Sequence, residues 1–122
     1  KDADDYMVLV ASEAEVRSLN PDIPAINELP VRGVIVTARS TTPGYDFISR
    51  FFAPRVGVIE DPVTGSAHCC LTPYWAAELD KKEMVAYQAS PRGGVLHVRL
   101  EGERVILAGQ AVTVFSAQWL AA

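Results

Sequence analysis

The stretch from Ser66 to Asp80 constrains the fold of this chain more than any other part of the sequence. Its apolar side chains fall on all sides of a helical wheel, and a helix of that kind is buried rather than laid on a surface. Pro73 lies inside the stretch, so we expect a kink or a missing hydrogen bond there. The apolar residues are Ala67, Cys69, Cys70, Leu71, Tyr74, Trp75, Ala76, Ala77 and Leu79. Other parts of the chain must therefore cover this helix on most of its sides.

The segments around this helix are mainly typical of short β-strands. Apolar or alternating runs predict strands at 6–10, 31–38, 46–53, 84–90, 95–100 and 104–115, the last bent at Gly109, with a further short strand at 118–120. Two short helices are expected early in the chain, at 13–19 and 22–30. We therefore expect an α+β fold in which a curved antiparallel sheet, or an incomplete barrel, wraps around the central buried helix.

The length and the charge of the chain restrict its organisation and its partners. With 122 residues, it is expected to form a single domain, 1–122. Its net charge is −4, whereas proteins that bind nucleic acid or anionic membranes through charge carry a basic excess, so we expect neither nucleic acid nor a membrane as a partner. No apolar run approaches the roughly 20 residues of a transmembrane helix.

The chain has two cysteines, Cys69 and Cys70, and two histidines, His68 and His97. Adjacent cysteines give no disulfide framework, which predicts a cytoplasmic protein with reduced thiols, and we expect both to be small buried side chains. Neither pair has the spacing of metal ligands, and no dinucleotide fingerprint is present, so no metal or cofactor is expected. His68 is expected to be packed and hydrogen-bonded, and His97 to lie on the surface.

The loop that leads into the central helix carries the clearest candidate site. It reads Glu-Asp-Pro-Val-Thr-Gly-Ser-Ala-His from residue 60 to residue 68. Thr64 and Ser66 can cap the helix, Gly65 lets a ligand approach the backbone, and the unpaired N–H groups of the first turn carry partial positive charge. These features predict an anion-binding site. The alternative is an ordinary helix cap beside a solvated acidic loop, with Asp61 closing a local turn.

The motif Glu-Asp-Pro-x-Thr-Gly-Ser-Ala at 60–67 resembles the signature of the PhzF family, the phenazine-biosynthesis isomerase-like proteins. Segments 46–54, 69–75, 92–94 and 109–114 resemble other parts of the family in the same order. The resemblance implies the diaminopimelate-epimerase fold, in which two similar halves each roll a sheet around a central helix and the active site lies between them. Family members are more than twice as long as this chain, so it matches only their C-terminal half. Since it also starts without Met, we expect it to be part of a longer protein whose N-terminal half carries the family's catalytic glutamate.

The resemblance also implies roles for the loop residues. Asp61 matches the catalytic aspartate of the C-terminal half, and Gly65 and Ser66, beside Thr64, match the residues that hold the substrate carboxylate at the helix N-terminus. The implied function is that of a cofactor-independent isomerase or epimerase acting on a small carboxylate-bearing substrate, and the isolated chain is expected to be inactive. An uncovered face between the halves would lead it to form a homo-oligomer or to pair with the missing half. The alternative is a non-catalytic barrel that binds a small anion or mediates association, and the sequence leaves open whether Gln110 faces the cleft or satisfies a bulge.

Overall fold

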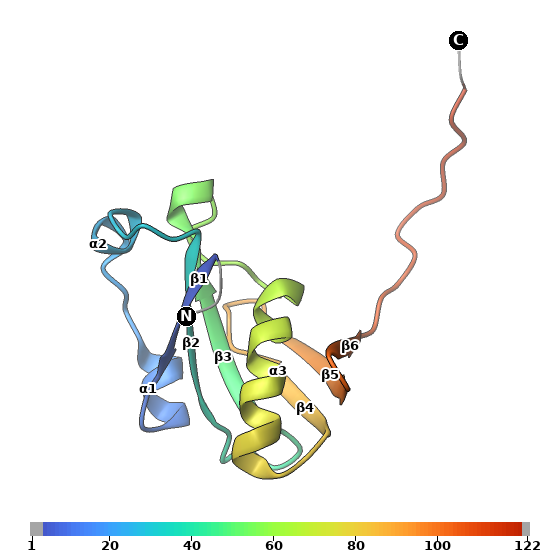
Figure 1. The fold of residues 1–122 in the computed structure, drawn as a ribbon. Coiled ribbons are helices and arrows are strands. Elements are labelled where there is room, and N and C mark those ends of the chain that lie inside the picture. The colour runs from blue at the N-terminus through green and yellow to red at the C-terminus, as the bar shows by residue number, and fades with distance from the viewer. Residues whose placement is uncertain (1–3, 121–122) are drawn as a thin grey trace.

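Six strands form one sheet in the computed structural model, which describes residues 4–120. In sheet order, which is also chain order, they are β1 (Asp5–Leu9), β2 (Gly33–Arg39), β3 (Phe47–Phe52), β4 (Glu83–Gln88), β5 (Gly94–Glu101) and β6 (Arg104–Ala108). The sheet curls into a half-barrel around the longest helix, α3 (Gly65–Leu79), as Figure 1 shows. Two short helices, α1 (Glu13–Ser18) and α2 (Ile23–Asn27), follow β1, and a 3-10 turn, η1 (Pro54–Val56), follows β3. The expected α+β fold, an incomplete barrel around a central helix, is confirmed.

The sheet separates two hydrophobic cores. One lies between the sheet and α3 and includes Phe47 and Phe51 of β3 with Trp75 of the helix. The other lies on the opposite face of β2 and β3, under α1 and α2, and includes Val16 and Phe52. Because β2 is covered on both faces, its first six residues are all buried, and apart from Thr37 they are apolar rather than alternating.

Strand directions differ from the expected antiparallel sheet at two of the five strand pairs. β1 runs parallel to β2, and β3 runs parallel to β4, whereas the other three pairs are antiparallel. The difference follows from the connections, because α1 and α2 join β1 to β2, and α3 joins β3 to β4. A helix returns the chain to the end of the sheet from which it came, so the next strand runs parallel to the previous one.

α3 is buried on one side only. Its opposite side, with Ser66, Cys69, Pro73 and Ala77, is exposed, because the half-barrel does not close between its edge strands β1 and β6. The expectation that the sheet covers the helix on most sides is therefore wrong, and Cys69 is exposed while Cys70 is half-buried. The helix continues without interruption through Pro73. Its buried residues are Ala67, His68, Leu71, Thr72, Trp75 and Ala76.

The end of the chain is less regular than the sequence indicates. β6 ends at Ala108, and residues 109–120 have no regular secondary structure, so the predicted strand 104–115 is cut short and the one at 118–120 is not formed. β5 begins at Gly94, so most of this segment has no strand beside it and lacks the hydrogen bonds that define one. Figure 1 shows the segment leaving the sheet, and its large apolar side chains are 80–91% exposed. No helix within residues 4–120 is long and apolar enough to cross a membrane.

Candidate functional site

The loop before α3 is anchored on one side by Arg50, which extends from the outer face of β3. Its guanidinium forms a two-pronged ion pair with Glu60, with Nε 2.7 Å from Oε1 and Nη2 2.9 Å from Oε2. The remaining nitrogen, Nη1, donates to the carbonyl oxygens of Leu19, at 2.7 Å, and Val16, at 3.3 Å, at the end of α1. The first acidic residue of the motif is therefore occupied in fixing the loop to the sheet.

Asp61 and Thr64 contact each other directly at the start of α3. The Thr64 hydroxyl donates to Asp61 Oδ2 at 2.5 Å, and the Asp61 N–H donates to the carbonyl oxygen of Phe51 at 3.0 Å. Thr64 occupies the N-cap position, but its side chain makes no capping hydrogen bond to the helix. The prediction that Thr64 caps the helix with its side chain is thus wrong, because the Thr64 hydroxyl donates its hydrogen bond to the carboxylate of Asp61 instead.

β4 and the turn after it hold the loop from the other side. Gln88 is almost completely buried, and it bonds both the backbone and the hydroxyl of Thr64. Ser90 donates its hydroxyl to the carbonyl oxygen of Pro62 at 2.9 Å. Together with Arg50, these contacts fix the backbone of 60–64 between β3 and β4.

Ser66 has a different hydrogen-bond partner from Asp61. Its hydroxyl oxygen accepts a hydrogen bond from Arg32 Nη2 at 3.1 Å. Arg32 is held in turn by a two-pronged ion pair with the fully buried Asp5, and this bond raises the pKa of Arg32. Because the Ser66 oxygen accepts from Arg32, its own proton remains available for a ligand. Gly65 and Ser66 are both exposed.

His68 is buried in the first turn of α3, as expected. Its Nδ1 lies 2.7 Å from the carbonyl oxygen of Thr64, while Nε2 is buried without a hydrogen-bond partner. Burial lowers the pKa of His68 below its ordinary value of 6.5, although the bond to Thr64 acts in the opposite direction. A neutral ring that donates through Nδ1 satisfies this geometry. His97 is exposed, also as expected.

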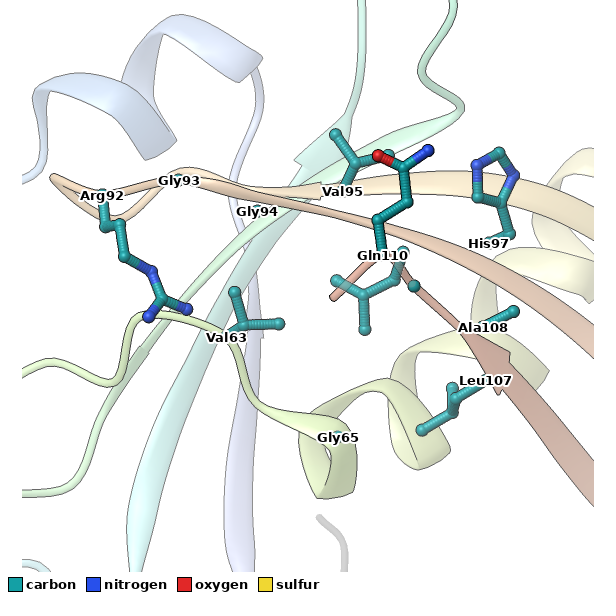
Figure 2. Close-up of a pocket in the computed structure, with 12 residues that line it drawn as sticks. Val63, Gly65, Arg92, Gly93, Gly94, Val95, His97, Leu107, Ala108 and Gln110 are labelled. Carbon is teal, nitrogen blue, oxygen red and sulfur yellow. The ribbon is translucent and has the colours of Figure 1, made fainter. Parts of the chain in front are cut away.

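A pocket of about 710 Å³ opens beside the start of α3. Figure 2 shows Gly65 at the first turn of the helix, Arg92 on the turn before β5, and Leu107 of β6 around this space. The turn packs closely on the loop, because a Cβ atom at Gly94 would lie only 2.2 Å from Val63 Cγ2. A cationic side chain, a helix start and apolar walls suit a small ligand that carries a negative charge.

The predicted site residues do not all line this pocket. Gly65 does, whereas Asp61, Thr64 and Ser66 are outside its lining, and Gln110 contributes to it from the exposed segment after β6. The structure therefore joins Asp61 to Thr64 by a hydrogen bond and leaves Ser66 and Gly65 at the exposed helix start. Within residues 4–120, no group of three or more His, Cys, Asp or Glu side chains is placed to hold a metal ion.

Three residues that support the site were missed by sequence reasoning, namely Arg32, Arg50 and Gln88. Gln88 had a detectable signal, because Met84, Ala86 and Gln88 alternate along their strand and so place a polar amide on the inward face. Arg50 had a weaker one, as the single charge within β3. Arg32 lies just before β2 and shows no comparable pattern.

Comparison with known proteins agrees with this architecture. The family model for phenazine biosynthesis-like proteins, PhzC-PhzF, matches residues 2–117. An uncharacterized isomerase of Halalkalibacterium halodurans is 54% identical over 116 residues, which cover 95% of this chain and 44% of that protein. An uncharacterized isomerase of Pseudomonas aeruginosa is 59% identical over 113 residues, which cover 93% of this chain and 42% of that protein.

A solved structure shows the same fold. The crystal structure of a PhzF-family phenazine biosynthesis protein from Enterococcus faecalis matches with a TM-score of 0.81 at 42% identity, and the match covers 84% of this chain and 39% of that one. The chain thus spans less than half the length of the curated relatives described above. With a family model that covers nearly all of its length and relatives above 50% identity, the chain belongs to the PhzC-PhzF family of phenazine biosynthesis-like, isomerase-related proteins.

Proposed function

We propose that this chain provides one side of the active site of an isomerase that moves a proton next to a carboxylate in a small substrate. Asp61 donates or accepts the proton, and Gly65 and Ser66 at the start of α3 hold the substrate carboxylate. Thr64, which sequence reasoning placed with them, instead positions Asp61, because its N–H is bonded to Gln88 and its hydroxyl proton to Asp61. The observation that carries this proposal is the 2.5 Å hydrogen bond from the Thr64 hydroxyl to the Asp61 carboxylate, which keeps an acidic group beside a helix N-terminus. Proton transfer needs an acid or base positioned close to donors that stabilise developing charge.

The start of α3 has the properties of an anion site. No side chain caps it, and its first residues, Gly65 and Ser66, are exposed. A helix of 15 residues places partial positive charge at this end, an interaction with an anion of about 0.3–1 kcal/mol at an exposed site. Arg32 orients the Ser66 hydroxyl so that its proton can reach a ligand.

The second group that handles the proton is proposed to come from the rest of the protein. Relatives are more than twice as long as this chain, which supports a facing half that supplies the partner base. The open side of α3 and the exposed apolar segment 109–120 are surfaces on which that half, or a second copy in a homo-oligomer, would pack. We place the reaction in the cytoplasm, because the two adjacent cysteines form no disulfide, and without a cofactor, because a helix N-terminus and a carboxyl can do this chemistry.

Replacing Asp61 in the complete protein tests the proposal. The assay follows deuterium from D₂O into candidate amino and hydroxy acids. Asp61→Asn should lower turnover by about 100-fold or more, the scale of lost acid–base catalysis. Ser66→Ala should weaken substrate binding more than it slows the reaction.

Asp80→Asn is the matched control, since it makes the same chemical change at the other end of α3. Asp80 is the C-cap in a left-handed conformation at φ 50°, which asparagine adopts readily. This variant should keep full turnover. If Asp61→Asn also keeps it, Asp61 is only a loop residue, and the helix start is better explained as an anion-binding site without catalysis.

A further inference from the structure

Gln88 stands out among the buried side chains because all of its polar groups serve one loop. It ends β4 on the inward face, and only 1% of it is exposed. Its Oε1 accepts the backbone N–H of Thr64 at 2.8 Å. Its Nε2 donates both to the backbone oxygen of Asp61, at 2.7 Å, and to the hydroxyl oxygen of Thr64, at 3.0 Å.

We infer that Gln88 is a positioning residue for the Asp61 carboxyl and acts through the hydroxyl of Thr64. A threonine hydroxyl has one proton to give. Because Gln88 donates to the Thr64 oxygen, that proton is directed away from Gln88 and onto Asp61 Oδ2, 2.5 Å away. The amide thus sets the direction of the hydroxyl, and the hydroxyl fixes one carboxylate oxygen.

The same arrangement leaves the second carboxylate oxygen of Asp61 open. None of the described residues donates a hydrogen bond to Oδ1, and Asp61 is partly exposed. Oδ1 is therefore the oxygen that meets the substrate, and its direction depends on the bond made to Oδ2. This step rests on the proposed function of Asp61, whereas the orientation of the hydroxyl by Gln88 does not.

Two substitutions of Gln88 separate its two contributions. Gln88→Met keeps the length of the side chain and removes every hydrogen bond. Gln88→Glu keeps an acceptor for the Thr64 N–H but removes both donors, so the hydroxyl loses its orientation while the loop keeps one anchor. Ser49→Ala is the matched control, because Ser49 is the register neighbour of Gln88, is equally buried, and has an oxygen without a hydrogen-bond partner.

The complete protein serves for two measurements on each variant. The first is the exchange of the Thr64 hydroxyl proton with water, followed by NMR. It should become about 10-fold faster or more in Gln88→Met and in Gln88→Glu and stay unchanged in Ser49→Ala, since a lost hydrogen bond is worth about that factor. The second is the deuterium-incorporation assay, in which kcat should fall about 10-fold or more with little change in KM, since misplacing a reacting group slows catalysis.

A double substitution shows whether the effect passes through Thr64. In a Thr64→Val background, replacing Gln88 should lower kcat much less than it does in the native background, because only its bonds to the loop backbone remain to be lost. A residue that only supports the fold would cause the same loss in both backgrounds. Unchanged hydroxyl exchange in a folded Gln88 variant overturns the inference, and so does an additive loss of kcat. If Asp61→Asn keeps full turnover, the proposed function fails while the hydroxyl measurement still decides the role of Gln88. Gln88→Glu provides the result if Gln88→Met does not fold.

Discussion

The ion pair between Arg50 and Glu60 should contribute strongly to the stability of the loop before α3. Arg50 makes four hydrogen bonds, two to the carboxylate of Glu60 and two to carbonyl oxygens at the end of α1. The side chains of Arg50 and Glu60 are only 12% and 15% exposed, so water screens the pair weakly. Arg50→Leu leaves a shielded carboxylate without a partner, and such a change costs about 3–5 kcal/mol.

Urea unfolding of the variants measures this cost as a change in the free energy of unfolding. Replacing both residues with leucine should recover about 1–3 kcal/mol relative to Arg50→Leu alone, because no carboxylate is then left unpaired. The recovery should be incomplete, since the carbonyl oxygens of Val16 and Leu19 still lose their donor. Arg99→Leu is the control, because Arg99 is 46% exposed and its pair with Glu101 is worth about 0–1 kcal/mol.

The relation between the single and double variants decides whether this reasoning holds. If the losses caused by Arg50→Leu and Glu60→Leu simply add, to within about 0.5 kcal/mol, then the two side chains do not act as a pair and the argument is refuted. If the two losses do not add, Glu60 stabilises the loop through Arg50. The adjacent Asp61, which has no such pair within residues 4–120, is then the acidic residue proposed to transfer the proton.

Three further outcomes are expected. Burial alone would raise the pKa of Glu13, but hydrogen bonds from Thr42 and its neighbours hold that pKa far below 4.5, so the carboxylate stabilises the fold above about pH 4.5 and progressively less as the pH falls. Glu13→Gln should lower the free energy of unfolding in urea by about 2 kcal/mol at pH 7 and make it decline less steeply in acid. An acid profile equal to that of the wild type would contradict this. Gly94→Ala should destabilise the chain by about 1–3 kcal/mol, because the new Cβ would meet Val63 at 2.2 Å, and a melting temperature equal to that of the wild type would count against it. Removing residues 109–120 should reduce self-association in sedimentation and lower the binding of an apolar dye, since five large apolar side chains there are at least 80% exposed; equal dye binding by both forms would show that this segment is not the adhesive surface.

The elements with strong local patterns were predictable from the sequence. α3, the two hairpins in the second half of the chain and the loop at 60–64 all follow from apolar runs, glycines and capping residues. The parallel pairing of β3 with β4 was not, because it depends on how a helix crosses the sheet rather than on any local pattern. The exposed side of α3 was also missed. An apolar pattern predicts that a helix is buried, but it does not indicate whether the residues that cover it belong to the same chain.

The position of the candidate site was predictable from the sequence, but the hydrogen bonds between its residues were not. The motif places Asp61, Thr64 and Ser66 at a helix start, and sequence reasoning assigned the hydroxyl of Thr64 to the helix. The structure gives that hydroxyl to Asp61, because Gln88 already holds the Thr64 backbone from β4. Contacts between residues more than 20 positions apart depend on strand register, which the sequence specifies only through the whole sheet.

The reversal of direction at the β2–β3 hairpin decides which side of the sheet each helix occupies. β1 and β2 run one way, and β3 and β4 run the other way, while the strands keep their order across the sheet. A connection between parallel strands is right-handed in nearly all proteins. Applied to strands that point in opposite directions, the same handedness sends the first crossover to one face and the second to the other, in agreement with the separate cores under α1 and α3. Chirality of the backbone thus places α3, the helix that follows the loop 60–64, on one side of the sheet and the short helices α1 and α2 on the other.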